Sequence, residues 1–319
     1  MHFPLICIPV CFAVRVLPGY SVYRKLVREF GETAEFMGTF LPASGDSYLL
    51  GMFYGNLKKR LGAEDTAVLI STKGGPASMV KLFPAERSAV LPANKVTNLV
   101  HLARFYGYGH LPIRVLHCNH GWMYQQVAGA LMGFRGFNFL SLYRAVFDSP
   151  GLENAVSPAF DWNKDALERM FRCKGLVPGK TVLLSPYARS MQVTTAGFWK
   201  ELARRLKENG YTVCTNANGS ERAVEGTGAV AIPYRYLVPF LEKAGALICS
   251  RSGLADVAST AHCRKIVLYP ADSRGIWGVG TALNSFSLNA MGLCEDAKEI
   301  EFDDGDGLIE RILIALRTP

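Results

Sequence analysis

The chain has 319 residues, 49% of them hydrophobic, and this length favours two folded domains over a single one. Its formal net charge of +8 indicates an acidic partner, such as a phosphorylated substrate or anionic lipid headgroups. Lysine and arginine form no long runs, so a nucleic-acid partner is not expected. The eight cysteines contain no CxxC pair, which favours reduced thiols in the cytoplasm over disulfides or zinc ligands.

The first 34 residues have no counterpart later in the chain. Residues 1–16 are apolar, but they lack a basic start and are too short to cross a bilayer. An irregular buried segment is favoured there over a contact with a membrane surface. The basic run Arg24-Lys25-Leu26-Val27-Arg28 and the pI near 9.1 nevertheless predict peripheral association with anionic membranes.

Strands and helices alternate through the N-terminal half. We expect strands at 36–41, 66–71, 87–91 and 112–117, and helices at 47–61, 76–83, 94–106 and 122–133. The stretch 148–160 is rich in residues that break regular structure, which indicates the connection to a second domain.

The C-terminal half repeats this alternation. We expect strands at 181–185, 211–215, 229–232, 245–249, 265–269 and 299–302, and helices at 195–209, 234–244, 253–262 and 306–317. Such a pattern predicts a parallel sheet with helices on both faces. We therefore predict an α/β protein of two doubly wound, Rossmann-like domains, residues 1–155 and 156–319, with a ligand cleft at the carboxyl ends of their strands.

Three loops at these strand ends carry polar side chains. Residues 251–256 (RSGLAD) link a strand to a helix, and such a turn binds anions through its free N–H groups and the helix dipole. The alternative is that Ser252 only caps the helix and Arg251 lies in solvent. Residues 185–190 (SPYARS) offer hydroxyls and a guanidinium. Asp46 suits a general base, although aspartate is also a preferred helix cap.

Two further residues border the predicted cleft. Asn216 ends a strand and is a candidate neighbour of a bound nucleotide, although its turn is ordinary in composition. His120 lies in the segment 117–122 (HCNHGW) and is a candidate for acceptor binding. A metal site at the two histidines of this segment is disfavoured, because no acidic ligand is close in sequence.

Several segments resemble the bacterial heptosyltransferase-type glycosyltransferases of family 9. The opening of that family is similar to residues 45–50 (GDSYLL), 57–61 (LKKRL) and 67–70 (AVLI). Its second half is similar to residues 182–188 (VLLSPYA) and 198–206 (FWKELARRL). The order and spacing of elements agree from about residue 36 to the end.

The resemblance implies a GT-B fold and transfer with inversion from a nucleotide-sugar donor, without metal or cofactor. Asp46 matches the family's proposed general base, and Gly45 and His120 are assigned to the acceptor side. The C-terminal domain is expected to hold the donor through Ser185, Tyr187, Arg189, Ser190, Asn216, Arg251, Ser252, Gly253 and Asp256.

Two motifs of the family differ in this chain. The family has Asp-Thr-Gly-x-x-His where this chain has residues 251–256 (RSGLAD), and its basic Lys-Arg-Trp segment is replaced by uncharged residues at 191–193. Arg189 and Arg251 are the cations available to replace the lost charge.

We therefore expect a cytoplasmic, metal-independent glycosyltransferase that is peripheral to the plasma membrane. Its acceptor would be a bacterial surface glycan, as in lipopolysaccharide or capsule biosynthesis, or a lipid-linked precursor. Two alternatives stay open. A nucleotide-sugar epimerase of the same fold would use carboxylates in both domains, and a non-catalytic module would bind a glycan or nucleotide within a larger synthase.

Overall fold

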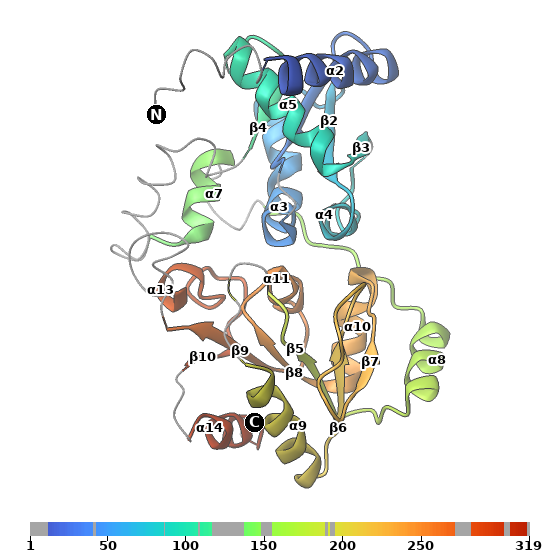
Figure 1. Cartoon of the computed structure of the whole chain (residues 1–319), viewed down its shortest axis with the longest axis vertical. Coiled ribbons are helices and arrows are strands. Elements are labelled where there is room, and N and C mark those ends of the chain that lie inside the picture. The colour runs from blue at the N-terminus through green and yellow to red at the C-terminus, as the bar shows by residue number, and fades with distance from the viewer. Residues whose placement is uncertain are drawn as a thin grey trace. The chain divides into compact units, whose positions relative to one another are not determined.

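The computed structural model describes residues 12–40, 43–85, 87–107, 109–116, 137–147, 155–188, 191, 195–271, 282–302 and 307–317 (Figure 1). The chain divides into two compact units. The N-terminal unit comprises Met1–His120 and Tyr143–Pro158, and the C-terminal unit comprises Gly121–Leu142 and Ala159–Pro319.

The N-terminal unit is built on a four-stranded parallel sheet in the order β3-β2-β1-β4. Its strands are β1 (Glu35–Gly38), β2 (Ala67–Thr72), β3 (Ser88–Leu91) and β4 (Ile113–Val115). The π-helical turn η1 (Phe12–Val16) leads into α2 (Leu17–Phe30). The other helices are α3 (Ser44–Arg60), α4 (Gly75–Val80), α5 (Ala93–Tyr106) and α7 (Phe139–Phe147), whose last part belongs to this unit.

Burial explains why these segments adopt this arrangement. All six residues of β2 are buried, as expected for a strand covered on both faces. Helices α2 and α5 lie side by side (Figure 1), and both contribute to one core with the sheet. In that core Leu26 of α2 and Leu99 of α5 pack with Phe36 and Val68 of the sheet.

The C-terminal unit contains a six-stranded parallel sheet in the order β10-β9-β8-β5-β6-β7. Its strands are β5 (Thr181–Ser185), β6 (Thr212–Asn216), β7 (Gly228–Val230), β8 (Gly245–Ser250), β9 (Arg264–Pro270) and β10 (Lys298–Phe302). Its helices are α8 (Lys164–Lys174), α9 (Ala196–Glu208), α10 (Tyr234–Ala244), α11 (Gly253–Ala258), α13 (Ala282–Phe286) and α14 (Leu308–Arg317). Helices α9 and α14 share one core with the same face of the sheet.

The strand order is that of a doubly wound sheet. Counted along the C-terminal unit, its strands follow the order 3-2-1-4-5-6, and the N-terminal unit contains the 3-2-1-4 part. The predicted α/β class and the parallel alternation of strands and helices are therefore confirmed. Each predicted strand has a counterpart displaced by at most a few residues at its ends.

Some predicted elements differ from the structure. Residues 12–16 form a regular helical turn in which Phe12 and Val14 are exposed and only Val16 is buried, so for these residues the prediction of an irregular, buried segment is wrong except for the burial of Val16. Helix α2 was not expected, and neither were α7, α8 and α13. The helix predicted for 253–262 ends at Ala258. The helix predicted for 122–133 lies outside the described residues.

Gly19 permits the close approach of α2 to α5. A Cβ atom at this position would lie 2.9 Å from the carbonyl carbon of Asn98 and even closer to its oxygen. Because that neighbour is backbone, it cannot rotate away. We predict that Gly19→Ala lowers the free energy of unfolding by about 1–2 kcal/mol, since overpacking outweighs the helix preference of alanine.

Chemical denaturation measures this change, with Ser21→Ala on the exposed face of α2 as the control. The control should be neutral or slightly stabilising. Equal stabilities for the two variants would show that the two helices do not pack this closely.

Candidate functional site

The C-terminal sheet reverses its winding between β5 and β8. These strands pair directly, with Ser185 opposite Cys249, and the chain leaves them in loops at the same edge of the sheet. Ser250 Oγ donates a hydrogen bond of 2.9 Å to the carbonyl oxygen of Pro186, which joins the two loops. Doubly wound sheets bind their ligands at this switch point, outside the carboxyl ends of the strands.

Ser252 lies in this loop with its hydroxyl unused. It occupies the N-cap position of α11 in an extended conformation, but its side chain makes no capping hydrogen bond. Its Oγ is shielded from solvent and has no hydrogen-bond partner among the described residues. Gly253 begins the helix. Ser252 therefore occupies the N-cap position, as the alternative predicted, but its hydroxyl does not cap the helix.

The side chain of Arg251 is directed into the protein and not into solvent. The residue is only 4% exposed, and its guanidinium donates three hydrogen bonds. Nη2 bonds Asp256 Oδ1 at 2.6 Å, Nη1 bonds the Ser252 carbonyl at 2.8 Å, and Nε bonds the Phe286 carbonyl at 2.9 Å. Arg251 thus links the turn, the helix that follows it and the end of α13. A direct contact of Arg251 with a diphosphate stays a prediction.

The surroundings of this ion pair are buried as well. Burial alone would lower the pKa of Arg251, but the adjacent Asp256 carboxylate favours the charged guanidinium and the net shift is upward. Tyr269, near the end of β9, donates its hydroxyl proton to the Glu299 carboxylate, and its oxygen accepts from the Leu288 N–H at 3.3 Å. Burial also raises the pKa of Tyr269, which keeps its hydroxyl protonated.

The other predicted donor residues lie on the same edge or outside the described residues. Ser185 is buried at the end of β5, and the Tyr187 hydroxyl donates to the carbonyl of Arg222. Asn216, at the end of β6, accepts at 3.5 Å from the backbone N–H of Ile232. Three predicted site residues fall outside the described residues: Arg189, Ser190 and His120.

Asp46 occupies the equivalent place in the N-terminal unit. The winding of this sheet reverses between β1 and β4, and α3 begins shortly after β1 ends. Ala43 is the N-cap of α3, so Asp46 is the third helical residue and not the cap. Phe40, in the loop before α3, has a positive φ of 58°, and such strained positions are enriched at functional sites.

Tyr143 is a site residue that the sequence did not reveal. Its side chain is completely buried in α7, and its hydroxyl donates a hydrogen bond to Asp46 Oδ1. This contact fixes the direction of the carboxylate. Helix α7 itself has a local signal, because Asn138 Oδ1 accepts from the Ser141 N–H at 3.0 Å, as an N-cap residue does.

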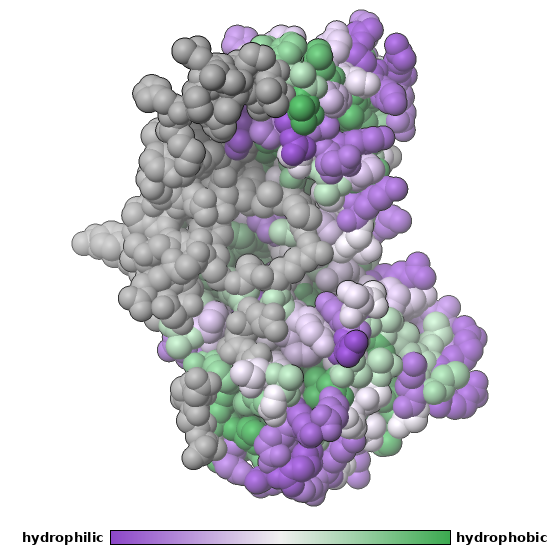
Figure 2. Space-filling view, in the orientation of Figure 1, coloured by the Kyte–Doolittle hydropathy of each residue, from purple (hydrophilic) through white to green (hydrophobic). Residues whose placement is uncertain are grey.

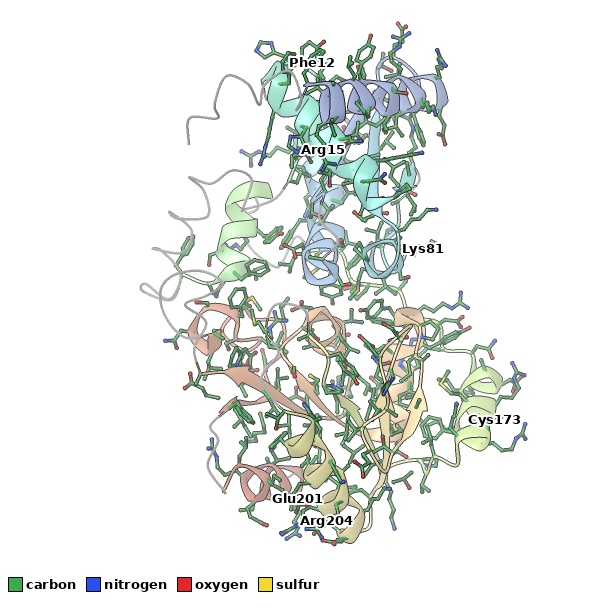
Figure 3. All side chains as sticks on the ribbon, viewed as in Figure 1. Phe12, Arg15, Lys81, Cys173, Glu201 and Arg204 are labelled. Carbon is green, nitrogen blue, oxygen red and sulfur yellow. The ribbon has the colours of Figure 1, made fainter. Side chains whose placement is uncertain are left out.

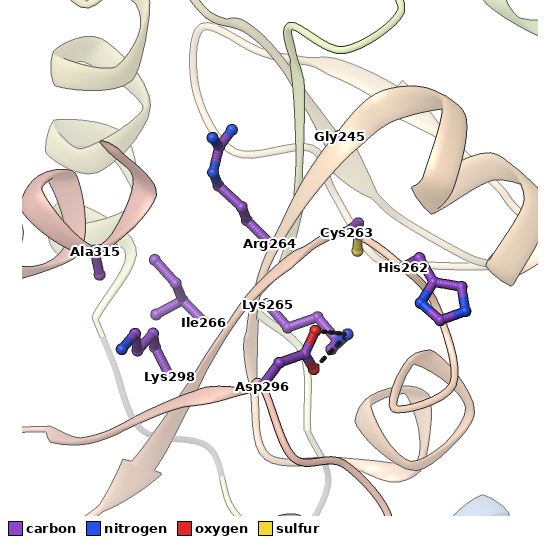
Figure 4. A pocket seen from close by; sticks show the side chains of 9 residues that line it. All are labelled: Gly245, His262, Cys263, Arg264, Lys265, Ile266, Asp296, Lys298 and Ala315. Carbon is purple, nitrogen blue, oxygen red and sulfur yellow. Dashed lines mark hydrogen bonds and ion pairs between the residues drawn. The ribbon is translucent and has the colours of Figure 1, made fainter. Parts of the chain in front are cut away.

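A hollow of about 400 Å³ opens at the opposite edge of the C-terminal sheet (Figure 4). Gly245, Arg264 and Lys298, at the amino ends of β8, β9 and β10, contribute to its wall. Beside it the Lys265 ammonium is buried and pairs with Asp296 Oδ1 at 2.9 Å. Because the hollow lies away from the switch point, it is not the candidate nucleotide site.

Among the described residues, no group of three or more histidine, cysteine and acidic side chains is arranged to hold a metal ion. The same part of the chain contains no helix that is long and apolar enough to cross a membrane.

The architecture matches solved structures of glycosyltransferases. Heptosyltransferase II of E. coli, an ADP-heptose lipopolysaccharide heptosyltransferase, superposes with a TM-score of 0.56 at 14% identity, covering 88% of this chain and 96% of that one. A family 9 glycosyltransferase of Veillonella parvula gives 0.53 at 11% identity, covering 87% and 88%. No family model matches the sequence, and no curated protein matches it either.

These similarities define the class of fold. The chain is an α/β protein with two parallel sheets, and it has the GT-B fold of the family 9 heptosyltransferases. The predicted resemblance is thereby confirmed for the fold over most of the chain.

The buried ion pair generates a stability prediction. Arg251→Ala leaves the Asp256 carboxylate buried without its cation, so we expect a loss of about 3–5 kcal/mol in the free energy of unfolding. The double substitution Arg251→Met with Asp256→Leu removes both charges and should recover most of this loss. Denaturant unfolding compares them, with Arg264→Ala on the surface as the control.

A loss below about 1 kcal/mol for Arg251→Ala would contradict the prediction, since the buried Asp256 carboxylate would have lost this cation at almost no cost. It would indicate that the guanidinium is exposed in solution and available to a ligand.

Proposed function

We propose that this chain is an inverting glycosyltransferase. It moves a sugar from a nucleotide-sugar donor to a bacterial surface glycan or to a lipid-linked precursor, on the cytoplasmic side of the membrane. The observation that carries the proposal is the shared GT-B fold in which each unit presents polar residues at its topological switch point. The similarity to an ADP-heptose lipopolysaccharide heptosyltransferase supports a nucleotide-sugar donor and a glycolipid acceptor.

The donor is assigned to the switch point of the C-terminal unit. The unpartnered Ser252 hydroxyl supports this assignment, because a shielded hydroxyl is costly unless a ligand or water bonds to it. Backbone N–H groups of the glycine turn would bind the diphosphate together with this hydroxyl. In this arrangement Arg251 acts as a positioning residue, because its ion pair with Asp256 holds the turn.

The base is assigned to Asp46 of the N-terminal unit. The acceptor hydroxyl oxygen attacks the anomeric carbon, the bond from that carbon to the diphosphate oxygen breaks, and Asp46 accepts the hydroxyl proton. The nucleoside diphosphate leaves with the electron pair, and its developing charge is stabilised by the N–H groups and hydroxyls of the donor site. Attack on the face opposite the leaving group gives the inverted anomer.

Among the enzymes with this fold, a transferase is favoured over a nucleotide-sugar epimerase by one contact. An epimerase would use a carboxylate in each unit, and Asp256, the carboxylate at the C-terminal switch point, is buried and bonded to Arg251. A non-catalytic binding module would not require the bond from Tyr143 that orients Asp46.

Asp46→Asn tests the base. The amide keeps the shape of the side chain but cannot accept the proton, so turnover should fall by roughly two to four orders of magnitude. The free energy of unfolding should change by no more than about 1 kcal/mol, the value of a carboxylate near a helix N-terminus. Affinity for the nucleoside diphosphate should be unchanged. Steady-state kinetics and calorimetry provide these values.

Two further variants control for indirect effects. Asp65→Asn removes an exposed carboxylate of the same unit and should leave turnover unchanged. Tyr143→Phe removes the hydroxyl that donates to Asp46 and should lower kcat with little change in KM for the donor. Near wild-type turnover by a folded Asp46→Asn variant that still binds the donor would refute the assignment.

Ser252→Ala tests the donor site. Loss of a hydrogen bond to a charged phosphate should weaken nucleoside-diphosphate binding by about 1.5–3 kcal/mol. Because this hydroxyl has no partner among the described residues, its removal should not destabilise the fold. Ser220→Ala, on an exposed turn of the same unit, is the matched control for titration calorimetry. Equal affinities of the two variants would remove Ser252 from the site.

A further inference from the structure

Exposed apolar side chains gather at one place on the N-terminal unit. In the described part of the chain, eleven large hydrophobic residues are exposed, and six of them belong to η1, to the first turn of α2 and to the end of α5. We call these six the aromatic patch: Phe12, Val14, Leu17, Tyr20, Phe105 and Tyr106. The other five are spread over both units.

Three members of the patch contact one another across elements that are distant in sequence. The ring centroid of Phe12 lies 5.1 Å from that of Phe105, which lies 5.4 Å from that of Tyr106. Val14, Leu17 and Tyr20 follow at a spacing of three residues along η1 and α2. Figure 3 shows Phe12 at the end of the unit where α2 and α5 meet, and Figure 2 shows hydrophobic surface beside hydrophilic surface there.

Packing among the described residues of this unit does not account for the patch. Helix α2 already buries Gly19, Val22 and Leu26 on the side that faces α5 and the sheet. Leu17 and Tyr20 lie on the opposite side, and Leu17 is 52% exposed. Contiguous exposed apolar surface in a folded protein marks an interaction site.

Cations continue the same face of α2 toward its C-terminal end. Arg24, Lys25 and Arg28 are exposed, and within the described residues they form no ion pair or hydrogen bond. The opposing carboxylates are Glu29, on the helix, and Glu32, just after it. The surface therefore combines an apolar half and a basic half along one helix.

We propose that the aromatic patch, with the three cations of α2, docks this chain on an anionic lipid bilayer. Aromatic and aliphatic side chains enter the interface between headgroups and acyl chains, while arginine and lysine bind the anionic headgroups. A second copy of the chain is a poorer occupant, because a symmetric contact would bring like cations together. A nucleic acid would leave the six apolar side chains uncovered. The inference does not depend on sugar transfer.

Vesicle co-sedimentation of the full chain tests this surface. We expect binding to phosphatidylcholine vesicles that contain about a third phosphatidylglycerol, much weaker binding to phosphatidylcholine alone, and release as salt rises. The triple variant Leu17→Ser, Tyr20→Ser, Phe105→Ser should lower the partition coefficient at least tenfold, roughly as its lost apolar area requires. Reversal of Arg24, Lys25 and Arg28 to glutamate should lower it roughly a hundredfold or more.

Matched controls separate this surface from bulk properties of the chain. Leu61→Ser, Trp162→Ser and Val177→Ser change exposed apolar residues elsewhere, and reversal of Arg169, Arg172 and Lys174 changes three cations of α8. Circular dichroism confirms that every variant is folded. Both controls should keep wild-type binding at low salt.

Three results would overturn the proposal. The first is that the wild type does not sediment with anionic vesicles. The second is that the control variants lose as much binding as the patch variants. The third is that the wild type is a dimer in sedimentation velocity, whereas the patch variant is a monomer with unchanged vesicle binding; a second copy of the chain would then be the partner of this surface.

Discussion

The reversal of winding in each parallel sheet is the constraint on which the arrangement of both units depends. Because right-handed crossovers place the helices of the two halves of the sheet on opposite faces, the loops after β5 and β8 separate at the carboxyl edge of the C-terminal sheet. The loop after β1 opens in the same way beside β4. Ser252 and Asp46 each follow one of these strand ends, so the topology determines where the proposed donor-binding hydroxyl and the proposed base lie.

The residue that stabilises this turn and the residue that we propose to bind the donor are neighbours in sequence. Arg251 and Asp256 form a buried ion pair whose guanidinium also bonds two carbonyl groups, and this anchors the turn to α13. The hydroxyl of Ser252, between them, has no partner in the part of the chain that the structure describes. A family motif of Asp-Thr-Gly-x-x-His is replaced here by an arginine at the first position and an aspartate at the last. In this chain the two altered positions, Arg251 and Asp256, bond to each other.

Local pattern was sufficient to predict most of the fold. The apolar runs at 36–41, 181–185 and 245–249, each followed by a turn, predicted three central strands, and the position of Asp46 at a strand end followed from the first of them. Helix α2 was missed because Pro18 and Gly19 suggest a break, although proline is favoured in a first helical turn and this glycine serves a close helix contact.

Contacts between distant residues could not be predicted from local pattern. Tyr143 reaches Asp46 from 97 positions away, and the burial of Arg251 depends on the Phe286 carbonyl, which lies 35 residues further along the chain. The sequence presented Arg251 as a free cation at a helix start. Only the packing of α13 shows that its guanidinium is directed inward.

The central claim is that the chain transfers sugars with inversion, and the anomeric outcome tests it most directly. A panel of nucleotide sugars is incubated with the full chain, with water as the acceptor, and the freshly released sugar is followed by NMR. The account predicts that one donor yields its nucleoside diphosphate and a sugar whose anomeric configuration is opposite to that of the donor. A released sugar that retains the donor configuration, or a panel in which no nucleotide sugar is bound or cleaved, would contradict it.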